Sequence, residues 1–191
     1  MTGLKIIAST SRRNWRIAAS GAALSVLALA PAFADAGAVL PPGPKENLAA
    51  WADGDVAGLK SLLALSKSAE EFRADLDTLS DERALAALAG YLALNTPLDM
   101  PGDDVPALIA ALPLDGKELF VQNCLSCHGG DRYFLQQHKS AEGWMGIFDA
   151  PYHRRLLTEG MEREIFADYA AATTPLTLDP VPEDLSDDRN Q

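Results

Sequence analysis

Hydrophobic positions along the chain recur at helical rather than strand spacing. Apolar residues three or four positions apart indicate one face of a helix, whereas strict alternation indicates a strand. Leu85, Leu88 and Leu92 follow the helical spacing, and Ala and Leu dominate while Val and Ile are sparse. Because Val and Ile are the residues that favour strands, the pattern predicts an all-α protein.

Capping residues and prolines divide this pattern into predicted helices. The first helical block runs from about residue 45 to 95, after a proline-rich lead-in (residues 35–44) without a packed core, and prolines make residues 101–106 a connector. Ser68 and Glu71 have the spacing of a capping box. The predicted helix starts are Ser68, Ser80, Asp115, Ser140 and Thr158, and the predicted stops are Asn95-Thr96-Pro97, Pro151 and Thr174-Pro175.

A degenerate repeat relates the two halves of the chain. Three blocks recur in the same order, the first two at an offset of 72 residues and the third at 78. They pair Lys45-Glu46 with Lys117-Glu118, Lys67–Phe72 with Lys139–Trp144, and Tyr91 and Thr96-Pro97-Leu98 with Tyr169 and Thr174-Pro175-Leu176. One six-residue insertion in the second copy explains the change of offset. Residues 35–110 and 111–178 are therefore predicted to be related helical domains, the first having the smaller repeat because it lacks the insertion.

The N-terminal stretch has the composition of an export signal. Residues 1–34 carry four basic residues and no acidic residue, then an apolar run over residues 17–29, and end in Pro31-Ala32-Phe33-Ala34, an A-x-A cleavage site. The apolar run is short and Ala-rich for a membrane span; an uncleaved anchor is the alternative. Ser11-Arg12-Arg13-Asn14-Trp15 also resembles a twin-arginine signal, so both export routes stay open. Export indicates, most simply, a bacterial periplasm.

The chain is strongly acidic. Its net charge is −11, and removal of residues 1–34 with their four basic residues leaves 157 residues with a charge of −15. Such a charge argues against nucleic acid or an anionic membrane as a partner. It suits docking to a basic surface of a redox protein, although a general solubility surface is the alternative. Residues 179–191 hold five acids and one arginine and are predicted to form a solvated acidic tail.

Cys124, Cys127 and His128 form a C-x-x-C-H motif, the attachment signature of a covalent c-type haem. Residues i and i+3 of a helical turn face the same side, so two thiols can bond to one porphyrin while the adjacent imidazole binds its iron. The alternatives are a structural disulfide, half a zinc site or a thioredoxin-like pair. The chain has no other cysteine for zinc, and the βαβ context of a thioredoxin-like pair is missing.

The motif occurs in the second copy only. Its positions correspond to Ala52, Asp55 and Val56 in the first copy, and no histidine precedes His128. Residues 35–110 therefore cannot hold haem by this motif. The sequence also lacks a Ser/His/Asp set, a P-loop and a dinucleotide fingerprint, so hydrolysis or nicotinamide chemistry has no support.

Residues 112–171 resemble a class I c-type cytochrome domain. Gly116 and Phe120 precede the motif where that family has a small residue and an aromatic, and Tyr169 lies where the family has an aromatic in its last helix. The resemblance implies a cytochrome c-like helical globule around one covalent haem c, with an exposed ring edge through which single electrons pass. A weaker resemblance, over residues 144–169, is to cytochrome subunits of periplasmic sulfite dehydrogenases.

The sequence departs from that family at the second iron ligand. Class I domains normally offer a methionine shortly before the last helix, and the corresponding position here is His153. Met145 lies too early and Met161 too late, so His153 is the predicted distal ligand; Met145, Met161 or an open site are the alternatives. A second imidazole implies a lower reduction potential than a methionine.

Three functions fit these features. The first is an electron-transfer protein, either a free shuttle or the cytochrome subunit of a dehydrogenase. The second is a haem enzyme or gas sensor, which needs an open or labile distal site. The third is a partner-binding module that acts through the haem-less residues 35–110.

Overall fold

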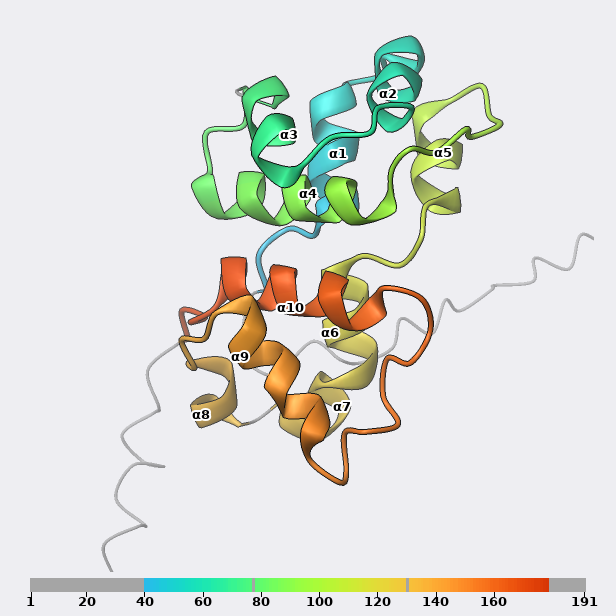
Figure 1. Ribbon diagram of the computed structural model, residues 1–191. Coiled ribbons are helices and arrows are strands. Elements are labelled where there is room, and N and C mark those ends of the chain that lie inside the picture. The colour runs from blue at the N-terminus through green and yellow to red at the C-terminus, as the bar shows by residue number, and fades with distance from the viewer. Residues whose placement is uncertain (1–39, 77, 130, 179–191) are drawn as a thin grey trace, which may run out of the picture. The chain divides into compact units, whose positions relative to one another are not determined.

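The regular elements of the described chain are all helical, which confirms the all-α prediction. The computed structural model describes residues 40–76, 78–129 and 131–178, so the predicted signal peptide and acidic tail lie outside the described residues. Figure 1 shows the order of the elements. They are α1 Pro44–Ala52, α2 Val56–Leu63, α3 Ala69–Asp75, α4 Glu82–Asn95, α5 Val105–Ala111, α6 Gly116–Asn123, α7 Leu125–His128, α8 Arg132–Leu135, α9 Ala141–Met145, the 3-10 helix η1 Gly146–Asp149, and α10 Glu162–Thr173. No helix among these residues is long and apolar enough to cross a bilayer.

Side-chain caps account for most helix starts. Ser68 and Glu71 form the predicted capping box of α3, and Asp115 forms an equivalent one with Glu118 at α6. The predicted cap at Ser80 is wrong by one residue. The carboxylate of Asp81 accepts hydrogen bonds from the backbone N–H groups of Arg83 and Ala84 and so caps α4.

The last helix begins later than predicted. Thr158 is not its cap, because α10 starts at Glu162 and Met161 precedes it. Two residues near Thr158 explain the delay, since Leu157 and Gly160 both have left-handed backbone angles, with φ of 50°. A right-handed helix cannot run through such residues. Residues 150–161 therefore form a series of turns between η1 and α10.

Two proline-rich segments are more ordered than predicted. Asp104 caps α5, and a proline, Pro106, lies in its first turn, where its missing N–H costs nothing. The predicted connector over residues 101–106 thus ends inside a helix. The lead-in over residues 35–44 also packs in its described part, because Leu40 contacts the core and Pro44, the first residue of α1, is buried.

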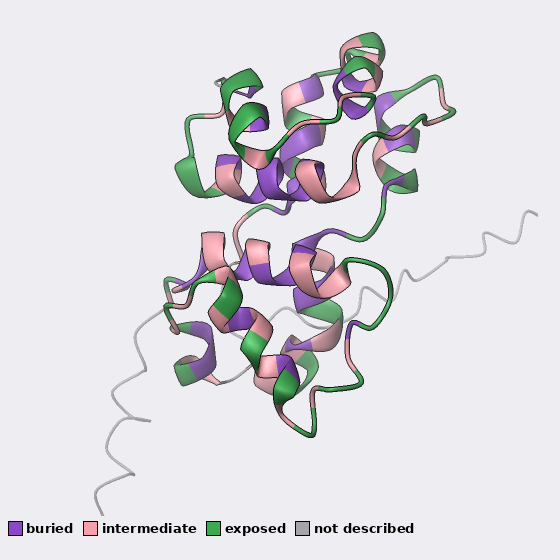
Figure 2. Cartoon of the chain, viewed as in Figure 1, coloured by how far each residue is buried: buried purple, intermediate pink, exposed green. Residues whose placement is uncertain are grey.

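Helices α4, α6 and α10 form the centre of the described core, with α10 packed on both α4 and α6 (Figure 1). Their inward faces are the buried stripes of Figure 2. The aromatic part of the core joins α6, α8, α9 and α10 through ring-to-ring contacts with centroid distances of 5.5–6.3 Å. Its members are Phe120, Phe134, Trp144, Phe166 and Tyr169.

The crossing of α6 and α10 depends on one glycine. A Cβ atom added at Gly116 would lie 2.1 Å from Cβ of Tyr169 and 2.8 Å from the carbonyl oxygen of Ile165. Only a residue without a side chain lets the two backbones approach this closely. The small residue before the motif thus has a packing role.

Equivalent positions of the two predicted copies contact each other reciprocally. The hydroxyl of Tyr91 donates to the carbonyl of Pro113 at 2.8 Å. The hydroxyl of Tyr169 donates to the carbonyl of Pro41 at 3.0 Å. Two ion pairs are reciprocal in the same way, because Lys45 pairs with Glu118 and Lys117 pairs with Glu46. These pairs follow the offsets of 72 and 78 residues that relate the copies. Such contacts approximate a two-fold axis, while the division into two domains stays a prediction.

The extra six residues of the second copy fall between η1 and α10. Helix α3 corresponds to α9 at the offset of 72, and α4 corresponds to α10 at that of 78. Two backbone hydrogen bonds that join the residues before and after this point also correspond: the N–H of Leu98 donates to the carbonyl of Leu63, and the N–H of Leu176 donates to that of Leu135. The turn segment 150–161 therefore contains the length that the first copy lacks, and this segment carries His153.

Candidate cofactor site

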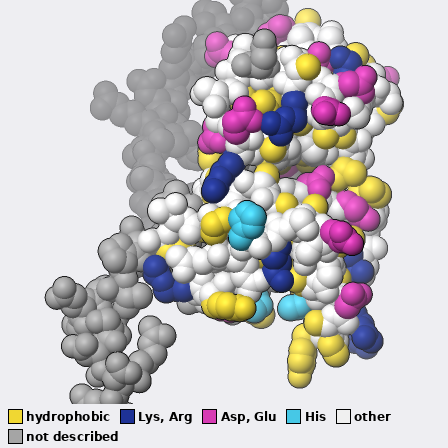
Figure 3. Space-filling view, turned by 60° about the vertical axis from the view of Figure 1, so that its left-hand side comes forward, with side chains coloured by type: hydrophobic (Ala, Val, Ile, Leu, Met, Phe, Trp, Pro, Cys, Tyr) yellow, Lys and Arg dark blue, Asp and Glu magenta, His cyan; other side chains and the backbone are white. Residues whose placement is uncertain are grey.

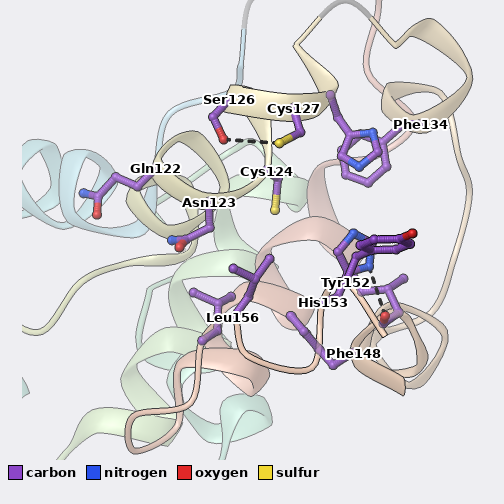
Figure 4. Close-up of a pocket in the computed structure, with 13 residues that line it drawn as sticks. Gln122, Asn123, Cys124, Ser126, Cys127, Phe134, Phe148, Tyr152, His153 and Leu156 are labelled. Atoms are coloured by element: carbon purple, nitrogen blue, oxygen red, sulfur yellow. Dashed lines mark hydrogen bonds between the residues drawn. The ribbon is translucent and has the colours of Figure 1, made fainter. Parts of the chain in front are cut away.

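The C-x-x-C-H motif forms one wall of a cavity of about 680 Å³. Figure 4 shows Cys124 and Cys127 on one side of it, with Phe148, His153 and Leu156 on the other. Its walls are mainly apolar and come from the end of α6, from α7, α8 and η1, and from the turns that follow. This volume lies within the range of about 300–1,000 Å³ that small-molecule and cofactor pockets occupy.

The two cysteines lie at the junction of α6 and α7 and differ in exposure. Cys124 is buried, and Cys127 is exposed. The backbone N–H groups of Cys127 and His128 both donate to the carbonyl of Cys124, so the motif makes one helical turn. Burial raises the pKa of the Cys124 thiol to about 12, and the nearby Cys127 adds to the shift. Neither cysteine is in a disulfide.

His128 has a defined orientation. Its Nδ1 lies 3.3 Å from a carboxylate oxygen of Asp131, and its ring stacks on Phe134 at a centroid distance of 4.3 Å. The pKa of Asp131 is lowered, first by the hydrogen bond from the backbone N–H of Phe134 and also by His128. An ionised carboxylate only accepts hydrogen bonds, so Nδ1 is the donor of this bond and Nε2 is the nitrogen left for another partner.

His153 faces the same cavity from the opposite wall. It belongs to the turn segment 150–161, and its Nδ1 lies 3.1 Å from the carbonyl oxygen of Ile147. A carbonyl only accepts, so Nδ1 is the donor of this bond and Nε2 is the nitrogen left for another partner. The ring centres of His128 and His153 are 6.1 Å apart. Residues 25 positions apart in the chain thus place two imidazoles around one cavity.

The alternative ligands do not line this cavity. Its walls contain neither Met145 nor Met161. Met145 packs against the core in α9, whereas Met161 is exposed just before α10. His138, predicted to be solvated, is exposed and lies outside these walls.

The rim of the cavity is partly aromatic. Tyr152 lines it and is 92% exposed, and Tyr133, next to the cavity residue Phe134, is 80% exposed. In the space-filling view, histidine side chains reach the surface at the lower edge of the described part, beside hydrophobic side chains (Figure 3). The cavity therefore opens to solvent.

Two residues of the site were not found from the sequence. Asp131 follows His128 by three positions, and this spacing is a signal for a side-chain partner on one helical face. Phe134 lies six residues beyond the motif in α8, which was not predicted. Among the residues that the structure describes, no three His, Cys, Asp or Glu side chains gather as a metal-binding group.

Comparison with known proteins adds no assignment. No family model, curated protein or solved structure matches the chain.

Proposed function

We propose that the chain is an exported c-type cytochrome that transfers single electrons through one covalently bound haem. The observation that carries the proposal is the joint position of three features. Both cysteines of the motif border the cavity, His128 adjoins them, and His153 faces His128 across it. A chance C-x-x-C-H sequence has no reason to line a cofactor-sized cavity opposite a second imidazole.

The spacing of the two histidines fits a metal between them. Two metal–imidazole bonds of about 2 Å each, plus about 1.1 Å from each nitrogen to its ring centre, span about 6 Å. The observed separation is 6.1 Å. Porphyrin nitrogens occupy four positions of a haem iron, so two protein ligands complete it. His128 and His153 would be these ligands, and Cys124 and Cys127 the attachment points.

An unpartnered polar atom also lies in the core behind this site. Trp144 is fully buried, and its indole N–H has no hydrogen-bond acceptor among the described residues. Its ring packs edge-on against Phe134, which lines the cavity. A buried donor without an acceptor is costly, but Trp144 is not among the residues that line the cavity, so its N–H is not assigned to a bound group.

The surroundings of the histidines favour a low reduction potential. A haem supplies one-electron exchange between ferrous and ferric iron, and the protein tunes it through the ligands. Asp131 makes the His128 imidazole a stronger donor, as carboxylates do for metal-bound histidines. Two imidazoles stabilise ferric iron better than an imidazole and a thioether do. The chain therefore fits an electron carrier better than an oxygen-activating centre.

The first experiment measures the mass and the visible spectrum of the exported protein. A covalent haem adds its mass to the peptide that begins at Asp35, and the ferrous protein gives a six-coordinate, low-spin spectrum with reversible one-electron titration. A colourless protein with the mass of the bare peptide would overturn the proposal. A five-coordinate, high-spin ferrous spectrum that readily binds carbon monoxide would instead support the enzyme or sensor function.

The second experiment tests the distal ligand by substitution. His153→Ala is expected to give a high-spin spectrum and carbon monoxide binding. His138→Ala, at the exposed histidine, is the matched control and is expected to keep the wild-type spectrum. A near-infrared methionine band in the wild-type protein, lost in Met145→Leu or Met161→Leu, would contradict the assignment of His153.

The partner proposed for this cytochrome is a redox protein with a basic docking surface. The charge of −15 after removal of residues 1–34 supports it. Stopped-flow electron transfer to such a partner is expected to slow steeply as salt rises from 0.01 to 0.15 M, on the order of ten-fold. A rate that does not depend on salt would contradict this docking mode.

A further inference from the structure

We infer that Arg163 is a positioning residue that holds His153 in place across the cavity. This inference rests on the proposed function, because it concerns the segment that carries the distal ligand. Arg163 lies in the first turn of α10, outside the segment 150–161, and does not itself line the cavity. It therefore acts through the segment rather than by contact with a bound group.

The guanidinium group of Arg163 bonds to the backbone just after His153. One terminal nitrogen donates to the carbonyl of Arg154 at 2.7 Å, and Nε donates to the carbonyl of Leu156 at 3.2 Å. Its central carbon lies 4.8 Å from the ring centre of Phe148, on the other side of His153 in the chain. One planar cation thus ties together both flanks of the histidine and α10.

The hydrogen bonds within the segment are those of turns, and the bonds from Arg163 add the connection to α10. Residues 150–161 form turns instead of a regular helix. Leu157, a buried cavity residue, has a left-handed φ of 50°. A branched residue adopts this conformation only where its surroundings impose it. Without the bonds from Arg163, we expect the segment to leave the cavity more often and to take His153 with it.

The test compares Arg163→Met with Arg155→Met in the haem-loaded protein. Methionine keeps an apolar stem over Phe148 but has no donors. Arg155 is an exposed arginine of the same segment, so its substitution removes the same charge at a similar place. The readout is the rate at which carbon monoxide displaces the distal ligand of the ferrous protein, since opening of the segment limits that rate.

Arg163→Met is expected to accelerate carbon monoxide binding by about ten-fold or more, because two charge-assisted hydrogen bonds are lost. Arg155→Met is expected to stay within about two-fold of the wild type by the same scale. Arg163→Lys keeps the charge and a single donor group, so a rate of carbon monoxide binding between those of the wild type and Arg163→Met supports the inference. If Arg163→Met does not fold, Arg163→Lys is compared with Arg155→Met instead. Equal rates in the variants at 163 and 155 would overturn it.

The outcome for His153→Ala separates this inference from the proposed function. If His153→Ala leaves a six-coordinate spectrum, the distal-ligand assignment fails. If His153→Ala opens the sixth position but Arg163→Met binds carbon monoxide no faster than Arg155→Met, only the role of Arg163 fails.

Discussion

Replacement of Gly116 by alanine is expected to destabilise the protein at the crossing of α6 and α10. The added Cβ would lie 2.1 Å from Cβ of Tyr169 and 2.7 Å from its Cγ. Carbon atoms in contact normally stay about 3.5–4.0 Å apart, so the helices must separate locally by about 1.4 Å. Neither obstacle is the end of a flexible side chain. Cβ of Tyr169 is bonded to the backbone of α10, and the carbonyl of Ile165 is part of it.

The magnitude follows from two opposing effects. Overpacking of this kind costs about 1–3 kcal/mol, and more where the backbone must move. An alanine at a helical position recovers about 0.4–1 kcal/mol through the lower entropy of the unfolded chain. We expect a net loss of about 2 kcal/mol in the free energy of unfolding. For a chain of this size that corresponds to a fall in Tm of roughly 4–8 °C.

Urea denaturation followed by far-ultraviolet circular dichroism measures this change. Gly146→Ala is the matched control, because an added Cβ at Gly146 meets no atom within 4 Å and its φ of −59° and ψ of −18° suit alanine. The control is expected to be neutral or slightly stabilising. If Gly116→Ala is as stable as Gly146→Ala, the close approach of α6 and α10 is not what requires glycine.

The remaining predictions concern the contacts between the two predicted copies and the proposed ligand His128. Burial raises the pKa of Tyr91 and of Tyr169 above the ordinary value, with a contribution from Asp115. The tyrosines of the unfolded chain ionise first, so the free energy of unfolding falls as pH rises above about 10, by about 1.4 kcal/mol per pH unit for each tyrosine. Urea denaturation between pH 9 and 11 is expected to show a flatter decline for the double Tyr→Phe variant than for the wild type. An equal decline in both proteins would refute the role of the tyrosines. Glu118→Gln removes the ion pair with Lys45 but keeps an acceptor for the helix cap. Urea titrations are expected to show that the free energy of unfolding falls by less than about 1 kcal/mol, and that this difference disappears in 1 M salt. A larger fall that does not depend on salt would contradict this. Asp131→Asn keeps the cap of α8 but weakens the hydrogen bond to His128. A redox titration of the variant is therefore expected to give a higher reduction potential than that of the wild type. An unchanged potential would show that the carboxylate does not tune His128.

Most helices were predictable because their signals are local. Periodic apolar residues, the capping box of α3 and the Thr-Pro stops all act within a few residues of where they stand. The starts of α4 and α10 differ from the prediction because local signals did not single out one residue there. Ser80 and Asp81 are adjacent, and both are residue types that can cap α4. Near Thr158, no residue in the sequence indicates that Leu157 adopts a left-handed backbone conformation.

The sequence alone determined the helical class of this protein, the C-x-x-C-H motif at Cys124, Cys127 and His128, and the repeat that predicts two related halves of the chain. These properties depend on residue type and spacing, which a linear pattern contains. Only the tertiary structure decided that His153, and neither methionine, faces His128, that Arg163 reaches the segment holding it, and that Tyr91 and Tyr169 bond across the two copies. Those contacts join residues far apart in the chain, so they depend on how the helices pack and on where one turn segment leads the backbone.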